Sequence, residues 1–280
     1  MGIRIVTDST SDLNEELIGK YNIEIAPLTV HFKDRAYKDT VEISAKMFYE
    51  KLKDCNELPK TSQVNPAEFE DIFENILKAK DEVLGIFISS DLSGTFNSAK
   101  IAKELIVNDK IHLIDSRNVT VGLGSIILYA AKLIEKGRTI DEIIKEIERI
   151  KNNSKLVVMA DTLEYLKKGG RLSPAKAMIG TILNLKPILV LKDGLIDTLD
   201  KVRGNGKGIT YMLEYVKDYI KEDSDIFVLN AASDEAAEKM IEKLKTEYGA
   251  KNVHKCDMGP TIGVHLGPGA VGIAILNLDV

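Results

Sequence analysis

With 280 residues, of which 44% are hydrophobic and 29% charged, the chain is long enough to bury a large core in one domain or two. Its 38 basic and 43 acidic side chains give a net charge of −5, which argues against a protein that coats nucleic acid or an anionic membrane. The sequence has no secretory signal in residues 1–13 and no long apolar run, so we expect a cytoplasmic protein.

The first half of the chain alternates short strands with helices. Strands are predicted at 3–7, 23–29, 83–88 and 111–114, and helices at 14–21, 68–78, 96–105, 121–137 and 140–152. This alternation is typical of an α/β fold with a mostly parallel sheet. Ligands of such sheets bind beyond the carboxyl ends of the strands, where the polar turns after Thr7, Ile88 and Ile114 fall.

A break at residues 152–154 predicts two domains, 1–153 and 154–280. In the second domain, strands are predicted at 156–160, 225–230, 253–257 and 270–276, and helices at 162–168, 208–220 and 234–248. Residues 188–191 and 195–198 are predicted to pair as a hairpin around Lys192-Asp193-Gly194. Because a hairpin is combined with crossover units, we expect this α/β domain to contain a mixed sheet.

Four short segments are dense in hydroxyl groups and glycines: residues 7–12, 61–63, 89–95 and 259–269. Hydroxyls and backbone N–H groups that open a helix after a strand suit a bound anion, because the helix dipole favours negative charge there. Ser93-Gly94-Thr95 is the best placed, since Gly94 lets the backbone approach a ligand closely. Ser93 can equally act as a helix cap, and the two roles can coexist.

His265 lies among the glycines and prolines of residues 259–269, which predict a tightly specified loop. An imidazole in such a loop can donate to a carboxylate, act as a base or satisfy a buried carbonyl. The loop context favours a ligand contact. His31, His112 and His254 have no such context, and we interpret them as structural or surface residues.

Common catalytic motifs are absent from the sequence. It has no Walker-type glycine loop with Lys-Ser/Thr, no Gly-x-Ser-x-Gly elbow and no His-Glu-x-x-His helix. The two cysteines, Cys55 and Cys256, lack the spacing of metal ligands, so we expect no metal and no cofactor. A hydrolase or phosphotransferase with Ser93 as nucleophile and His265 as base remains an alternative.

Residues 167–207 contain nine Lys or Arg and three Asp, so this window carries +6 (nine minus three) in an acidic chain. Both a solvated basic face and a docking face for an anionic surface or a phosphate agree with this pattern.

The order and spacing of these motifs resemble the DegV family of fatty-acid-binding proteins over essentially the whole chain. The resemblance rests on residues 7–12, 61–63, 89–95, 114–116, 166–173, 185–188 and 263–269. One departure is Val64, where the family pattern has proline before Asn65-Pro66.

The resemblance implies two α/β domains with a long-chain fatty acid in a slot near their interface. The residues that it implies as ligands of the fatty-acid carboxylate are Thr61, Ser62, Ser93, Gly94, Thr95 and His265. It also implies that a separate ATP-dependent kinase phosphorylates the bound fatty acid to an acyl phosphate. The chain would then be a lipid-binding subunit of a fatty acid kinase, and not itself an enzyme.

Arg171 and Arg203 match positions that the resemblance assigns to recognition of that kinase or of the nascent phosphate. Transient contact with a membrane surface agrees with such a role, whereas nucleic acid is not an expected partner. A carrier of another small organic acid remains a further alternative, because related folds hold different ligands.

Overall fold

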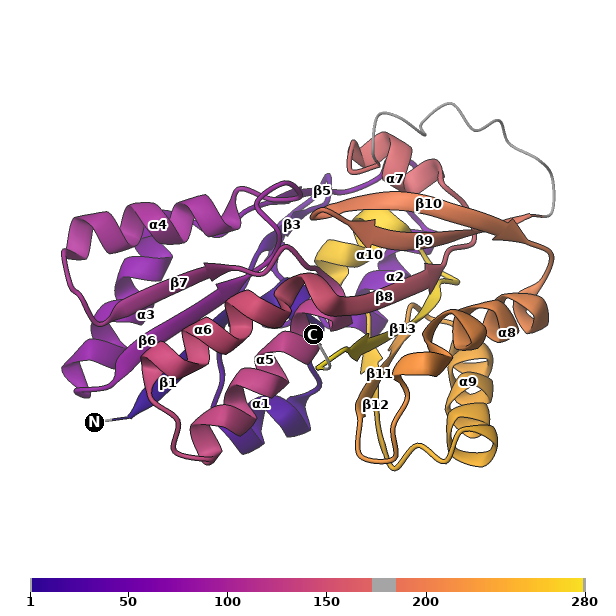
Figure 1. Cartoon of the computed structure of the whole chain (residues 1–280). Coiled ribbons are helices and arrows are strands. Elements are labelled where there is room, and N and C mark those ends of the chain that lie inside the picture. The colour runs from indigo at the N-terminus through magenta and orange to yellow at the C-terminus, as the bar shows by residue number, and fades with distance from the viewer. Residues whose placement is uncertain (1, 173–184, 279–280) are drawn as a thin grey trace.

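The computed structural model describes residues 2–172 and 185–278, which form three β-sheets with helices packed on them (Figure 1). The first sheet is wholly parallel, in the order β2 (Glu24–Ala26), β1 (Ile3–Asp8), β6 (Glu82–Phe87) and β7 (Ile111–Asp115). Its strands are covered on both faces, and the buried central residues of β1 and β6 are apolar, as in Ile5-Val6 and residues 83–87.

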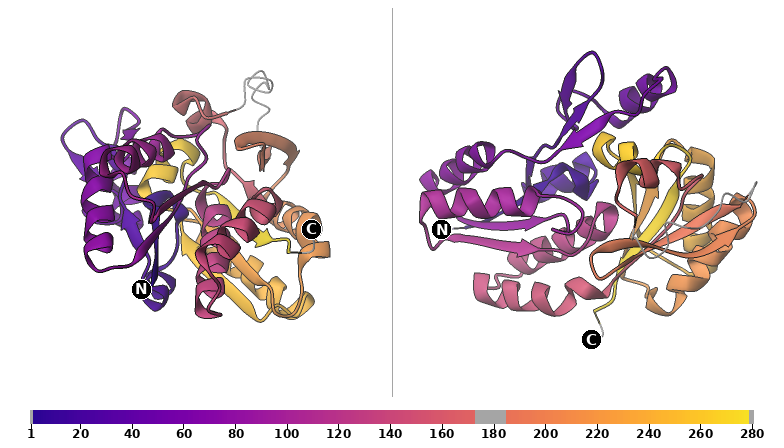
Figure 2. Two further views of the ribbon diagram at one scale, coloured as in Figure 1. Left: turned by 60° about the vertical axis from the view of Figure 1, so that its left-hand side comes forward. Right: turned by 90° about the horizontal axis from the view of Figure 1, so that it is seen from above.

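Helices cover both faces of the first sheet (Figure 2). One face carries α3 (Pro66–Lys78) and α4 (Thr95–Ile106), and the other carries α1 (Glu15–Tyr21), α5 (Thr120–Glu135) and α6 (Ile140–Ile150). Helix α3 shows how the sequence encodes this packing. The Asn65 side chain caps its start, and Phe69, Phe73 and Ile76 recur at helical spacing and are buried.

The second sheet is mixed and comes from the C-terminal part of the chain. Its order is β10 (Leu195–Val202), β9 (Lys186–Lys192), β8 (Ser154–Met159), β13 (Val271–Leu276), β11 (Asp225–Asn230) and β12 (Asn252–Asp257). All neighbours are antiparallel except β11 and β12. Helices α8 (Asn205–Val216) and α9 (Asp234–Glu247) pack on one face. The predicted fold class, with a parallel and a mixed sheet, is confirmed.

Helix α5 lies between the two large sheets and contacts β1 and β6 of the first as well as β8, β11 and β13 of the second. It is buried almost all round, which explains why its sequence has little polar character. One hydrophobic cluster therefore runs through both parts of the chain. The division at residue 153 stays a prediction, although the strands of the two large sheets fall on either side of it.

The region between β2 and α3 differs from the prediction. The single strand expected at 23–29 is two strands, β2 and β3 (Thr29–His31), because Pro27 lacks the N–H needed to continue a strand ladder. Strand β3 pairs antiparallel with β4 (Ala36–Lys38) and β5 (Lys60–Ser62), forming a third sheet. Helix α2 (Ala45–Lys53) lies in the same region of the chain, between β4 and β5.

The loop predicted around His265 is instead a short helix, α10 (Pro260–Leu266), which packs against α2 and α7 (Glu164–Gly169). Part of the predicted basic window, residues 173–184, lies outside the described residues. Among the helices that are described, none has the length and apolar character required to cross a bilayer.

Candidate functional site

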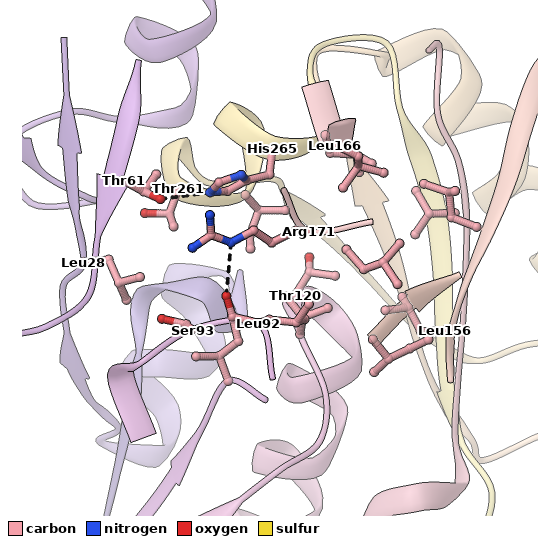
Figure 3. Close-up of a pocket in the computed structure, with 18 of the residues that line it drawn as sticks. Leu28, Thr61, Leu92, Ser93, Thr120, Leu156, Leu166, Arg171, Thr261 and His265 are labelled. Carbon is pink, nitrogen blue, oxygen red and sulfur yellow. Dashed lines mark hydrogen bonds between the residues drawn. The ribbon is translucent and has the colours of Figure 1, made fainter. Parts of the chain in front are cut away.

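A cavity of about 350 Å³ lies where the first sheet, the third sheet and the second sheet meet (Figure 3). Its polar lining residues come mainly from three places: β5, the turn between β6 and α4, and α10. The side chains and backbone that form this polar part belong to Thr61, Ser62, Gln63, Ser93, Gly94, Thr120, Arg171, Thr261 and His265. The turn after β6 is at the carboxyl edge of the parallel sheet, where ligands of such sheets bind.

Thr61 and His265 meet at the polar end of the cavity although 204 positions separate them in the chain. The Thr61 hydroxyl and His265 Nε2 are 2.9 Å apart and share a hydrogen bond. His265 Nδ1 is buried and has no hydrogen-bond partner among the described residues. The imidazole therefore keeps the capacity for one more hydrogen bond.

Burial, and then the nearby Arg171 guanidinium, lowers the pKa of His265 to about 4. Both causes disfavour the imidazolium, so His265 is neutral at pH 7. A neutral imidazole offers one N–H donor and one acceptor nitrogen. The polar end thus places the Thr61–His265 hydrogen bond beside the positive charge of Arg171, a combination that suits an anionic oxygen.

Ser93 lies in the turn that leads from β6 into α4, and its hydroxyl contacts the start of that helix. The Ser93 Oγ atom is 2.9 Å from Thr95 Oγ1 and accepts from Thr95 N at 3.3 Å. Gly94 lets the Gln63 side chain pack closely, because a Cβ atom at this position would overlap the amide group of Gln63. Ser93 therefore lines the cavity, whereas the N-cap of α4 is Gly94, so the alternative role of Ser93 as the helix cap is not the one in the structure.

Arg171 extends from the segment after α7 to the polar end, where Figure 3 shows its guanidinium beside His265 and Leu92. Its Nε donates to the Leu92 carbonyl at 3.3 Å, and its Nη1 donates to the Gly169 carbonyl at 2.7 Å. Arg203 is exposed in the loop between β10 and α8 and does not line the cavity. Only one of the two predicted arginines therefore faces the cavity.

Two buried carboxylates hold α10, the helix that carries His265. Asp12 Oδ1 accepts from Gly259 N at 2.9 Å, and Asp39 Oδ2 accepts from Thr261 N at 3.1 Å. Anionic oxygens at a helix start satisfy N–H groups that the helix leaves unpaired. Burial raises the pKa of Asp39 to about 6, and burial also raises the pKa of Asp12.

The opposite part of the cavity is apolar and is formed largely by the second sheet. It includes Leu156 and Val158 of β8, residues 189–191 of β9 and Ile196 of β10, facing Ile88 and Val119 from the N-terminal part of the chain. An apolar chamber with a few polar groups at one end is the usual form of a site for an amphipathic small molecule.

The other predicted site residues have distinct positions. Ser62 lines the cavity, but its hydroxyl is 2.8 Å from His31 Nε2 and lies on an exposed stretch. Thr95 is fully buried behind Ser93 and does not line the cavity, and its N–H already donates to Ser93. His112 and His254 pair with Glu82 and Asp225, away from the cavity lining.

Three polar lining residues were missed by the sequence reasoning: Gln63, Thr120 and Thr261. Gln63 and Thr261 lay inside segments that the sequence singled out, so hydroxyl and amide density was a usable signal. Thr120 carried no signal, because its position depends on an unusual backbone φ of 50° and on a hydrogen bond from its hydroxyl to Asp12.

The hydrogen bonds around Ser93 and His265 do not form a nucleophile–base pair in the described part of the chain. Ser93 contacts Thr95, whereas His265 contacts Thr61. The described residues also contain no cluster of three or more His, Cys, Asp or Glu side chains able to hold a metal ion. Within the described residues, the cavity therefore has polar groups gathered at one end but no paired nucleophile and base.

A sequence model of the family described as "Uncharacterised protein, DegV family" matches residues 2–278. The chain belongs to the DegV family. It is 37% identical to the protein DegV of Bacillus subtilis over 276 residues, 98% of each chain.

Solved structures agree with this assignment. The fold is similar to that of DegV from Bacillus subtilis, described as a fatty acid binding protein, with a TM-score of 0.89, 37% identity and 99% of each chain covered. A DegV family protein from Thermus thermophilus, whose structure is described by its fatty acid binding, has a TM-score of 0.91 and 30% identity. That comparison covers 99% of this chain and 100% of the Thermus thermophilus protein.

Proposed function

We propose that this DegV family member binds a long-chain fatty acid in the cavity between the sheets. The carboxylate lies at the polar end beside Thr61, Ser93 and His265, and the acyl chain extends along the second sheet. The observation that carries the proposal is a largely apolar cavity whose polar end contains a neutral buried imidazole and Arg171. The fatty acid binding described for the Bacillus subtilis and Thermus thermophilus relatives supports it.

The acyl chain and the carboxylate are expected to contribute different amounts to the free energy of binding. Burying an alkyl chain contributes about 0.8 kcal/mol per methylene, so roughly a dozen methylenes contribute on the order of 10 kcal/mol before the costs of association. Each hydrogen bond to the charged carboxylate adds about 1.5–3 kcal/mol. The acyl chain therefore dominates affinity, and the polar end fixes orientation.

The finer proposal is that the chain presents this carboxylate to a separate kinase, which transfers phosphate from ATP to form an acyl phosphate. Two features support it: the described residues of the cavity contain no nucleophile–base pair, and Arg171 adds a positive charge beside the polar end, where a phosphate would form. The exposed Arg203 is proposed as a docking residue for the kinase. A cytoplasmic location and transient contact with a membrane surface belong to the same proposal.

The test is a double substitution, Ser93→Ala with His265→Ala, assayed with the fatty acid kinase catalytic protein and ATP. Acyl phosphate formation is expected to fall by at least about tenfold, because two polar contacts to the carboxylate are lost. His112→Ala is the matched control, since His112 pairs with Glu82 outside the cavity. An unchanged yield from the double variant would exclude this site, and turnover by the chain alone would exclude the partner kinase.

A further inference from the structure

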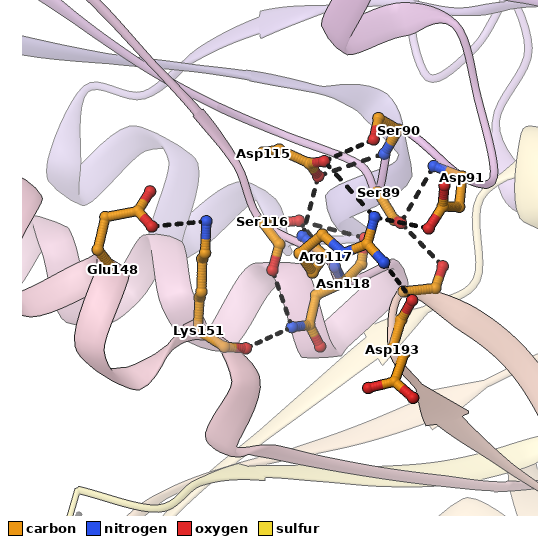
Figure 4. Close-up of polar contacts among 11 residues, drawn as sticks. Ser89, Ser90, Asp91, Asp115, Ser116, Arg117, Asn118, Glu148, Lys151 and Asp193 are labelled. Carbon is orange, nitrogen blue, oxygen red and sulfur yellow. Dashed lines mark hydrogen bonds and ion pairs between the residues drawn. The ribbon is translucent and has the colours of Figure 1, made fainter.

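The tip of the β9–β10 hairpin is held against the N-terminal part of the chain by two side chains (Figure 4). Ser89, directly after Ile88, donates from its hydroxyl to the Gly194 carbonyl at 2.8 Å. Arg117, in the loop after β7, donates from Nη2 to the Asp193 carbonyl. Both acceptors are backbone carbonyls of the hairpin turn, so the contact depends on the shape of that turn.

The turn has the shape that this contact needs. Lys192 pairs with Leu195, which leaves a two-residue turn whose residues, Asp193 and Gly194, have φ values of 50° and 78°. Positive φ at both central residues is the type I′ turn that matches the twist of a hairpin. A Cβ atom at Gly194 would lie 2.6 Å from both Arg117 Cζ and Ser89 Oγ, so glycine also permits the close approach.

Arg117 is itself held from the N-terminal side. Its Nη1 lies 2.6 Å from a carboxylate oxygen of Asp91 and 3.9 Å from one of Asp115. Asp115 also accepts from the Arg117 N–H at 3.0 Å, which fixes the backbone of the loop. The guanidinium thus bridges two carboxylates on one side and the hairpin turn on the other.

This contact lies at the border of the apolar part of the cavity. On the N-terminal side, Ile88 precedes Ser89 and Val119 follows Arg117 by two positions, and both line the cavity. On the hairpin side, Leu191 and Ile196 flank the turn by two positions and line the cavity too. A hairpin released at its tip would therefore carry away part of the apolar wall.

We propose that Ser89 and Arg117 are positioning residues that hold the β9–β10 hairpin over the acyl chain. They act through the wall residues of the hairpin and do not touch the carboxylate. Through the hairpin, these two residues determine how much affinity each added methylene contributes. They also determine the rate at which a long fatty acid dissociates. This inference rests on the proposed function, because it assigns a role within the same fatty-acid site.

The experiment measures dissociation constants and dissociation rates of saturated fatty acids with 12, 14, 16 and 18 carbons. It compares the intact chain with Arg117→Gln and with Ser89→Ala. Ser89→Ala keeps the backbone carbonyl that accepts from Leu92 N and Ser93 N, so it remains informative if Arg117→Gln does not fold. Arg138→Gln is the matched control, because Arg138 pairs with Glu142 on α6.

We expect both variants to bind the 12-carbon acid almost as the intact chain does. The 18-carbon acid is expected to bind roughly three- to tenfold more weakly and to leave faster by a similar factor, the size of one lost hydrogen bond. Gly194→Ala, which disturbs the same contact from the hairpin side, should give the same dependence on chain length. Arg138→Gln should match the intact chain at every length.

Equal weakening at all chain lengths would show only a loss of fold stability and would overturn the inference, as would wild-type behaviour of both variants. If the intact chain binds none of these acids, the proposed function itself fails. The two failures are therefore distinguished by the intact chain alone.

Discussion

The two ends of the cavity are built in different ways. The polar end joins Thr61 of β5, Ser93 of the turn between β6 and α4, and His265 of α10, and hydrogen bonds fix their side chains. The apolar end is a continuous wall of three adjacent strands, β8, β9 and β10, whose lining side chains have no polar groups. Polar groups act only at defined angles and distances, whereas apolar burial scales with area. In the proposed complex, the first end would therefore govern orientation and the second would govern affinity.

The largest expected loss of fatty-acid affinity comes from a charged side chain introduced into the apolar wall. Ile196→Asp is expected to lower fatty-acid affinity by about 100-fold, because an unpaired carboxylate is costly next to an alkyl chain. Leu199→Asp is the matched control, since Leu199 lies on the same strand but is 41% exposed. Isothermal titration with an 18-carbon fatty acid measures both. Similar losses in the two variants would contradict the role given to the wall.

The next test concerns the neutral imidazole at the polar end. Because the pKa of His265 is about 4 in the folded chain and about 6.5 when unfolded, the unfolded state alone gains a proton between these values. The contribution of His265 to stability is therefore present above pH 6.5 and is lost as the pH falls toward 4.

Between pH 7 and pH 5 this loss amounts to about 2 kcal/mol of unfolding free energy. Denaturant unfolding of the ligand-free chain and of His265→Gln at both pH values measures it, because other titrating groups cancel in the difference. A difference between the two chains that does not change with pH would contradict a neutral, buried His265.

The smallest expected effect is that of a single hydroxyl at the polar end. Thr61→Val keeps the shape of the side chain but removes the hydrogen-bond partner of His265 Nε2. Fatty-acid affinity is expected to fall by roughly tenfold or less, and that of the corresponding methyl ester to change little. A fluorescence displacement assay with both ligands would sharpen the comparison. Equal losses for acid and ester would place the effect outside carboxylate recognition.

Much of the fold was predictable because its elements are encoded locally. Periodic apolar residues and caps predicted most strands and helices of both large sheets, and Lys192-Asp193-Gly194 predicted the hairpin. The exception between β2 and α3 depends on Pro27, whose interruption of the predicted strand sends the chain into a third sheet. No periodic pattern of apolar residues in the sequence indicates that change of direction.

The site was only partly predictable, because its geometry depends on distant partners. Residues 259–269 are so rich in glycine and proline that they predicted a loop, yet part of this segment forms α10. The helix is supported by Asp12 and Asp39, which are more than 200 positions away and accept from its first N–H groups. The Thr61–His265 contact likewise joins two residues that are far apart in the sequence. Sequence motifs therefore named the polar segments but did not give their contacts.

The most direct test of the central claim is to purify the intact chain, denature it and identify the released organic acids by mass spectrometry. A near-stoichiometric long-chain fatty acid is the predicted result, and its length distribution would report the space beyond the polar end. A folded sample that releases no fatty acid, and that takes up none when a 16- or 18-carbon acid is added, would contradict the account.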